Sequence, residues 1–163
     1  MDSRVKFLGH SIHQILIVFP LGLLATACVF DAVHLANKDD TSATVAFWML
    51  VSGIVGGLVA APFGTIDWLA IPANTRAKRI GLYHGLANVV ALVMFVASAW
   101  LRWDAVLSPP TSAYGLSFGG LAMSLLGGWL GGELVARLGV GVDDGAHLDA
   151  PNSLSGKPAR SAP

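Results

Sequence analysis

Histidines and carboxylates interrupt the long apolar stretches of this sequence at only a few positions, and these side chains could do chemistry. The residues concerned are His10, His13, Asp31, His34, Asp67, His84 and Glu133. If the apolar stretches lie in a membrane, ionisable residues within them are rare and are often functional. Neutral imidazole nitrogens ligate haem iron or a transition metal ion, and a nearby carboxylate or amide can orient the imidazole ring.

Two kinds of cofactor fit this set of residues. His13 and His84, with His10 as an alternative, would be axial ligands of a haem b iron held between facing helices. Alternatively, His13, His84 and Asp67 would bind a transition metal such as iron, zinc or copper. In either case Asp67 or Asn88 would orient a histidine ring. A third possibility is the passage of protons or ions along His and Asp side chains.

Each polar residue also has a plain structural explanation. The early histidines would lie in the lipid headgroup region, and Asp67 would end a helix. Glu133 would pair with Arg137, which follows it by one helical turn. Asp31 and His34, three residues apart, would form the polar end of a helix on the other side of the membrane. Taken singly, these explanations are favoured, but the clustering of the other residues at one end favours a shared site.

The composition identifies the elements that position these residues. Of the 163 residues, 54% are hydrophobic and 12% are charged, whereas soluble domains contain about 25% charged residues. An apolar helix of about 20 residues crosses a bilayer, and backbone polar groups in lipid must be paired within the chain. We therefore expect four helices, near residues 12–36, 42–69, 80–102 and 114–138.

Short polar loops between these helices predict an all-α, up-down-up-down transmembrane bundle. Basic residues are unequally divided between its two ends. The end that carries both termini has eight, namely Arg4, Lys6, Arg76, Lys78, Arg79, Arg137, Lys157 and Arg160. The other end has only Lys38 and Arg102. Because positive residues stay in the cytoplasm, both termini should be cytoplasmic. Residues 1–142 would form the membrane domain, and residues 143–163, rich in Gly, Pro, Ser and Asp, a disordered cytoplasmic tail.

Small residues recur at the spacing that lets helices approach closely. Gly53 and Gly57 form one such pair, and the fourth helix has two more, at Gly127, Gly128, Gly131 and Gly132. We expect these glycines to serve internal packing rather than a homodimer face. Pro20, in the middle of the first span, should kink that helix.

The sequence excludes several classes of protein. It has no P-loop, no nucleophile elbow and no HExxH motif, which argues against an enzyme acting by itself. The formal net charge is zero, so no nucleic-acid partner is expected. The single cysteine, Cys28, cannot form an intramolecular disulfide.

Three stretches of the chain together resemble a known family. They are Gly9-His10-Ser11-Ile12-His13 continuing to Phe19-Pro20-Leu21-Gly22; Phe63-Gly64-Thr65-Ile66-Asp67-Trp68 with Arg79-Ile80-Gly81-Leu82-Tyr83-His84-Gly85; and Gly127-Gly128-Trp129-Leu130-Gly131-Gly132-Glu133. Over roughly residues 8–142 the chain is identified as a member of a bacterial membrane-protein family, domain of unknown function 2231. The family pattern has prolines where this chain has Ser11 and Gln14, and often a histidine in place of Leu138. The resemblance therefore carries over His13, Asp67 and His84 first.

The resemblance implies a multi-pass protein of the bacterial inner membrane with no established activity. Its histidine layout looks like that of quinol- or haem-type redox membrane proteins. The first hypothesis is thus a haem- or metal-binding redox membrane subunit. The second is a non-enzymatic structural or partner-binding membrane protein, whose glycine faces dock a second copy or a redox membrane partner in the lipid bilayer. The third is a small transporter, which ranks last because no ladder of polar residues joins the two ends.

Overall fold

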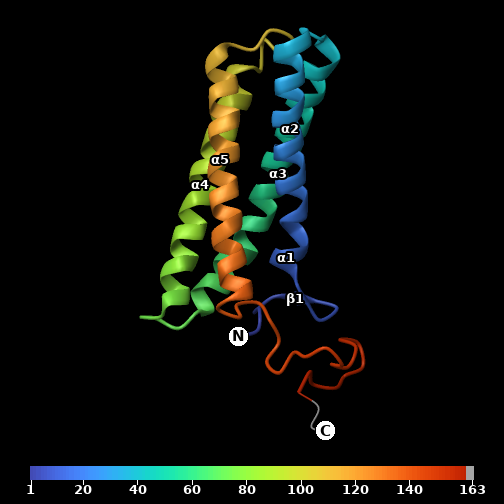
Figure 1. Cartoon of the computed structure of the whole chain (residues 1–163), viewed down its shortest axis with the longest axis vertical. Helices are drawn as coiled ribbons and strands as arrows, with labels where there is room; N and C mark the ends of the chain where they lie inside the picture. The colour runs from blue at the N-terminus through green and yellow to red at the C-terminus, as the bar shows by residue number, and fades with distance from the viewer. Residues whose placement is uncertain (161–163) are drawn as a thin grey trace.

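The computed structural model describes residues 1–160, and these fold almost entirely into helices (Figure 1). The elements in order are β1 (Lys6–Phe7), β2 (His10–Ser11), α1 (Ile12–Leu16), α2 (Val18–Asn37), α3 (Asp40–Ala70), α4 (Arg76–Leu101) and α5 (Thr111–Ala136). Within the described residues, four helical segments are long and apolar enough to cross a membrane: Ile12–Asn37, Asp40–Ala70, Arg76–Leu101 and Thr111–Ala136. The predicted all-α fold with four candidate spans is confirmed.

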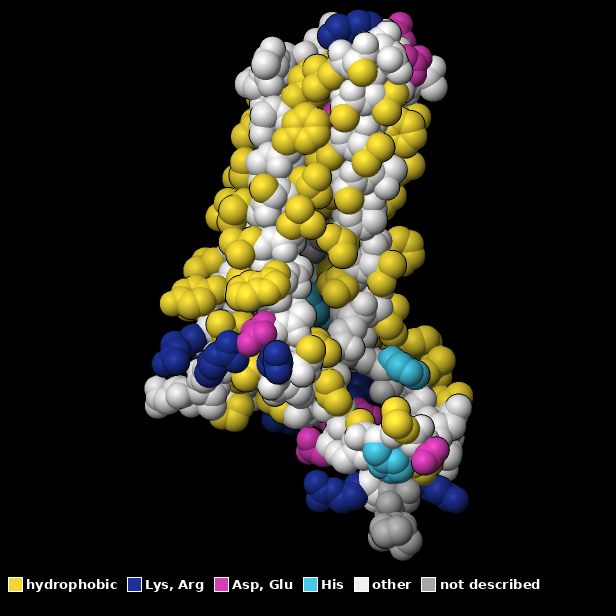
Figure 2. All heavy atoms as spheres, in the orientation of Figure 1, with side chains coloured by type: hydrophobic (Ala, Val, Ile, Leu, Met, Phe, Trp, Pro, Cys, Tyr) yellow, Lys and Arg dark blue, Asp and Glu magenta, His cyan; other side chains and the backbone are white. Residues whose placement is uncertain are grey.

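Successive helices run in opposite directions, so both termini lie at one end of the bundle (Figure 1). The bundle is built from two helical hairpins. α2 packs along α3 and α4 packs along α5, whereas contacts between the hairpins are much less extensive. Hydrophobic side chains cover the length of the bundle, and charged side chains gather at its two ends (Figure 2). The arrangement is that of a bundle surrounded by lipid, while its orientation in the membrane stays a prediction.

Residues at the loops determine where the helices begin. The Asp39 carboxylate accepts hydrogen bonds from the amides of Thr41 and Ser42 at 3.2 and 2.9 Å, and so caps α3. The Thr75 hydroxyl accepts one from the amide of Lys78 at 3.1 Å and caps α4. Such caps satisfy amides that have no partner inside the helix. They extend the helices a few residues beyond the ranges expected from hydropathy.

Pro20 interrupts the first span, as expected. It has no N–H to donate to the Leu16 carbonyl, and its ring crowds that carbonyl. The helix accordingly breaks at Ile17, between α1 and α2. His13 lies before this break, in α1.

The glycine pairs divide between the interior and the surface of the bundle. A Cβ atom on Gly53 would lie 2.6 Å from Leu24 Cγ, and one on Gly57 would lie 3.4 Å from Leu92 Cδ1. Both glycines therefore serve internal packing, as expected. A Cβ atom on Gly128 or Gly132 would meet nothing within 4 Å among residues 1–160. These two glycines of α5 lie on an open face.

The two termini of the membrane domain hold each other. The Met1 ammonium donates a hydrogen bond to the Gly139 carbonyl at 2.9 Å, and the Gly141 amide donates one to the Met1 carbonyl at 2.9 Å. Lys6 forms an ion pair with Asp143. The segment before α1 and the segment after α5 thus form a cap across one end of the bundle. The disorder predicted for the tail beyond it stays a prediction, and residues 161–163 of that tail lie outside the described residues.

Replacing Gly53 by Ala should destabilise the bundle, because the added methyl group collides with Leu24. Overpacking of this kind costs about 1–3 kcal/mol. Gly128→Ala is the matched control, and it should be neutral or slightly stabilising because alanine has the higher helix propensity. Thermal unfolding of the detergent-solubilised protein measures both. Equal effects of the two substitutions would contradict the internal role of Gly53.

The stability of the cap should depend on pH. The hydrogen bond from Lys6 holds the pKa of the Asp143 carboxyl below its usual value of 3.8, and Asp143 in turn raises the pKa of Lys6 above 10.5. The pair therefore stabilises the cap between about pH 4 and pH 10, and this contribution disappears below and above that range. We expect Asp143→Asn to speed hydrogen exchange of the Gly141 amide at pH 7. Asp149→Asn is the control, and it should leave that rate unchanged.

Candidate functional site

The two histidines expected as first ligands lie together at the end of the bundle that carries the termini. Their ring centres are 6.4 Å apart and their ring planes are nearly perpendicular, at 88°. His13 belongs to α1 and His84 to α4, so each hairpin supplies one ring. Both side chains are half-buried. The pair therefore joins the two hairpins across the diagonal of the bundle.

Backbone carbonyls fix both rings in the same tautomer. His13 Nδ1 lies 3.2 Å from the carbonyl oxygen of Ala60, and His84 Nδ1 lies 2.8 Å from that of Gly127. A carbonyl oxygen can only accept, so in both rings Nδ1 carries the proton. Each Nε2 is then left with a lone pair. A histidine that ligates a metal has this arrangement, because its second nitrogen usually donates to a carbonyl or carboxylate.

Glycines on the facing helices make room for the two rings. A Cβ atom on Gly64 of α3 would lie 2.6 Å from His13 Cε1. A Cβ atom on Gly131 of α5 would lie 3.1 Å from His84 Cε1. Real Cβ atoms essentially never show contacts under 3.0 Å, so the His13 ring occupies space that glycine leaves open. A Cβ atom on Gly131 would require the His84 ring to shift by a few tenths of an ångström. These glycines position the histidines as well as allowing the helices to pack.

Asn88 lies one turn beyond His84 and holds its ring from one side. The Asn88 side-chain amide donates a hydrogen bond to the His84 carbonyl at 2.8 Å. Its Nδ2 also lies 3.4 Å from both ring nitrogens of His84. A Cβ atom on Gly127 would lie 2.8 Å from the same Nδ2. Asn88 is therefore placed to orient His84.

Two other residues expected at this site lie elsewhere. His10 is exposed on the β1–β2 hairpin, with Nδ1 3.1 Å from the carbonyl of Leu8. The Asp67 carboxylate lies 2.7 Å from the Ser3 hydroxyl and accepts a hydrogen bond from the Arg4 amide at 2.7 Å. Asp67 thus anchors the segment before α1 to α3. The structure does not bring it to the histidine rings.

Glu133 also takes a different partner from the one expected. Its carboxylate pairs with Arg76 at the start of α4, with a separation of 2.6 Å, rather than with Arg137. Among residues 1–160, no three His, Cys, Asp or Glu side chains form a group that could hold a metal ion. The histidine pair therefore offers two protein ligands from the described chain.

The opposite end of the bundle contains a polar cluster that sequence reasoning missed. Arg102 forms two hydrogen bonds with the Asp31 carboxylate, at 2.7 and 3.1 Å. Its Nη2 also donates to the hydroxyls of Ser98 and Ser117, at 3.0 and 3.2 Å. Arg102 is 0% exposed and Asp31 is 1% exposed. This cluster joins α2, α4 and α5 inside the bundle.

The sequence held a signal for this cluster. Asp31 was expected only to form the polar end of a helix, but it pairs with Arg102, the residue that directly follows α4. Ser98 and Arg102 are four residues apart, so they share a helix face. The expected topology already placed that face and Asp31 at the same end. A buried arginine needs a charged partner and further acceptors. Asp31 and the serines supply them to Nη1 and Nη2 of Arg102, whereas its Nε has no partner among residues 1–160.

Comparisons with known proteins give one result. A family model described as "Predicted membrane protein (DUF2231)" matches residues 9–144. The match covers both histidines of the pair and the buried ion pair. No curated protein and no solved structure matches the chain.

Removing one of the two charges of the buried ion pair should strongly destabilise the folded protein. Asp31→Asn leaves the Arg102 charge without a counter-charge, which costs about 3–5 kcal/mol in comparable sites. The double change Asp31→Leu with Arg102→Met removes both charges, so it should recover most of that loss. Unfolding curves of the solubilised protein give the two free energies. A double variant that is as unstable as the sum of the two single variants would contradict this role of the pair.

Proposed function

The chain belongs to the DUF2231 family of predicted membrane proteins, and from its paired histidines we propose that it is a redox membrane subunit holding a haem b iron between His13 and His84. The observation that carries the proposal is the pair itself. Two imidazole rings from different hairpins meet inside the bundle, each with Nδ1 bonded to a carbonyl. Haem iron of this type would supply one-electron transfer.

The spacing of the rings supports a shared metal ion. Two imidazole nitrogens that bind one ion from opposite sides, at about 2.0–2.1 Å each, put the ring centres about 6 Å apart. The observed separation is 6.4 Å. Haem iron needs only two axial protein ligands. Because the described chain provides two such ligands and no third, haem fits better than a bare transition metal ion.

The packing of the helices also supports this location. The group would lie between the two hairpins, where helix contacts are less extensive than within each hairpin. A histidine side chain is recessed in a hollow between α5 and the α1–α2 segment (Figure 2). Asn88 would orient His84, and Gly64 and Gly131 would keep the space beside the rings open.

The membrane and its sidedness are part of the proposal. We place both termini in the cytoplasm and the four spans in a bacterial inner membrane. Burial of Arg102 strengthens the charge argument, because Lys38 is then the one exposed basic residue at the opposite end of the described chain. A positive excess at the end that carries the termini supports a cytoplasmic location.

A second candidate function is partner binding, and one observation favours it. Gly128 and Gly132 form a small-residue pair on an open face of α5. Small residues at this spacing let a second helix approach closely. The occupant would be another copy of this chain or a redox membrane partner. This role is compatible with a haem site between the hairpins.

The test is spectroscopic. Protein purified in detergent from haem-replete cells should show a Soret band and bound iron. His13→Ala and His84→Ala should each remove the band, since one axial ligand is lost. His147→Ala, in the segment after α5, is the matched control and should keep it. A colourless, metal-free preparation would exclude the proposal, as would a Soret band that survives in every variant.

A further inference from the structure

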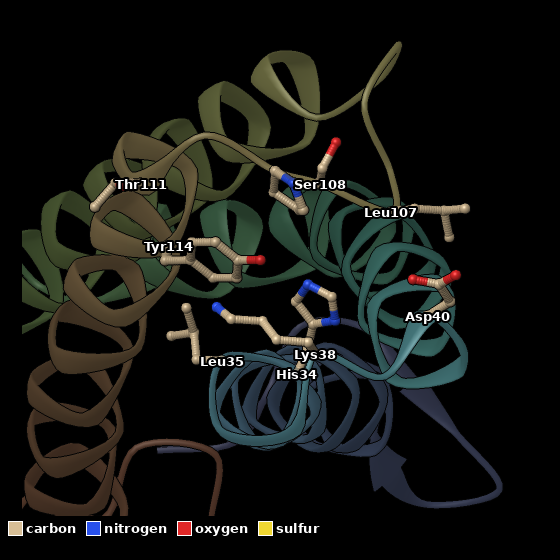
Figure 3. A pocket seen from close by; sticks show the side chains of 9 residues that line it. His34, Leu35, Lys38, Asp40, Leu107, Ser108, Thr111 and Tyr114 are labelled. Atoms are coloured by element: carbon tan, nitrogen blue, oxygen red, sulfur yellow. The ribbon is translucent and has the colours of Figure 1, made fainter.

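A pocket of about 380 Å³ opens at the end of the bundle opposite the termini (Figure 3). Its walls come from the end of α2, the start of α3, the loop before α5 and the first turn of α5. The residues that matter below are His34, Leu35, Lys38, Asp40, Leu107 and Tyr114. The pocket lies where spans end, which is the depth of lipid headgroups. It is separate from the histidine pair at the other end.

His34 presents an unused acceptor to this pocket. Its side chain is 5% exposed, and Nδ1 donates to the Asp39 carbonyl at 2.8 Å. Nε2 therefore has a lone pair, and it has no hydrogen-bond partner among residues 1–160. Because this nitrogen lines the pocket, water or a ligand in the pocket would be its partner.

Tyr114 presents an unused hydroxyl beside it. Its side chain is 7% exposed, its ring stacks beside that of His34 with centres 6.4 Å apart, and Arg102 lies 5.4 Å from the ring centre. The hydroxyl points toward His34 across the pocket (Figure 3). This hydroxyl lines the pocket and forms no hydrogen bond with another residue in the described range 1–160. The His34 nitrogen and the Tyr114 hydroxyl are therefore both available to a polar group that enters the pocket.

Opposite charges lie on the two sides of these groups. The Lys38 ammonium is directed toward Tyr114, whereas the Asp40 carboxylate lies on the other side of His34, near Leu107 (Figure 3). Leu35 and Leu107, at 40% and 50% exposed, add apolar surface to the pocket. The ligand should therefore carry an anionic group, a cationic group that donates hydrogen bonds, and an apolar part.

We propose that this pocket binds a phosphoethanolamine headgroup, supplied by a phospholipid of the adjacent membrane leaflet. The phosphate would accept hydrogen bonds from Lys38 and the Tyr114 hydroxyl. The ammonium would donate to the Asp40 carboxylate and to His34 Nε2. The start of the acyl chains would lie against Leu35 and Leu107. A choline headgroup has no N–H to donate, and a glycerol headgroup has no positive charge, so neither satisfies the second half of the pocket.

Native mass spectrometry of the detergent-purified chain tests this proposal. The protein is offered phosphatidylethanolamine, phosphatidylcholine and phosphatidylglycerol in equal amounts. We expect about tenfold preferential retention of phosphatidylethanolamine, which corresponds to one charge-assisted hydrogen bond. Lys38→Ala should lower retention of all three lipids. Tyr114→Phe should do the same, because its hydroxyl donates to the phosphate that the three lipids share. Asp40→Asn should lower retention of phosphatidylethanolamine and remove its preference over phosphatidylcholine.

The controls separate this site from general lipid binding. Asp104→Asn, an exposed carboxylate in the same loop region, and Lys157→Ala, an exposed lysine after α5, should change nothing. Unchanged thermal unfolding of each variant shows that the fold is intact. Equal retention of the three lipids, or a preference that survives Asp40→Asn, would overturn the proposal. Soluble glycerophosphoethanolamine that binds as tightly as the lipid would overturn the lipid as its source.

Discussion

The ion pair between Asp31 and Arg102 is the constraint from which the rest of the bundle follows. Charges of this kind are costly in lipid, so both side chains must lie inside the protein, and they do. Arg102 reaches from the end of α4 to α2 and is held there by serines of α4 and α5. The two hairpins are thereby fastened to each other at one end. The ion pair also affects the nearby pocket, because Arg102 lies against the ring of Tyr114, which lines that pocket.

At the other end the hairpins meet through His13 and His84, beside the Lys6–Asp143 ion pair of the cap. His13 and His84 face each other along the same diagonal that the ion pair spans at the far end. Backbone carbonyls and glycines hold these rings, so no ionised group is needed to position them. The carboxylates near this end, Asp67 and Glu133, are engaged with the segment before α1 and with α4.

Hydropathy and charge counts predict the features that the bilayer imposes, such as the number and direction of the helices. They predict few of the contacts that depend on side-chain geometry. The four helices and the proximity of His13 to His84 follow from span length and alternating direction. The partner of Asp67 does not, because the segment before α1 folds back onto α3, and no periodicity marks that fold. His10 was expected near His13 as an alternative ligand, but it lies in a short hairpin stabilised by backbone pairing. Arg102 was expected at the end of the third span and was counted with Lys38 among the basic residues of that end of the bundle. Only the matching depth of Asp31 and Ser98 would have revealed its burial.

Electron paramagnetic resonance of the oxidised, purified protein tests directly whether His13 and His84 ligate one iron together. The ring planes are 88° apart, and perpendicular axial imidazoles give low-spin ferric haem a strongly anisotropic signal with a large maximal g value. That signal is the expected result. A high-spin signal, a low-spin signal typical of parallel imidazole planes, or the absence of any haem signal would contradict ligation by this pair.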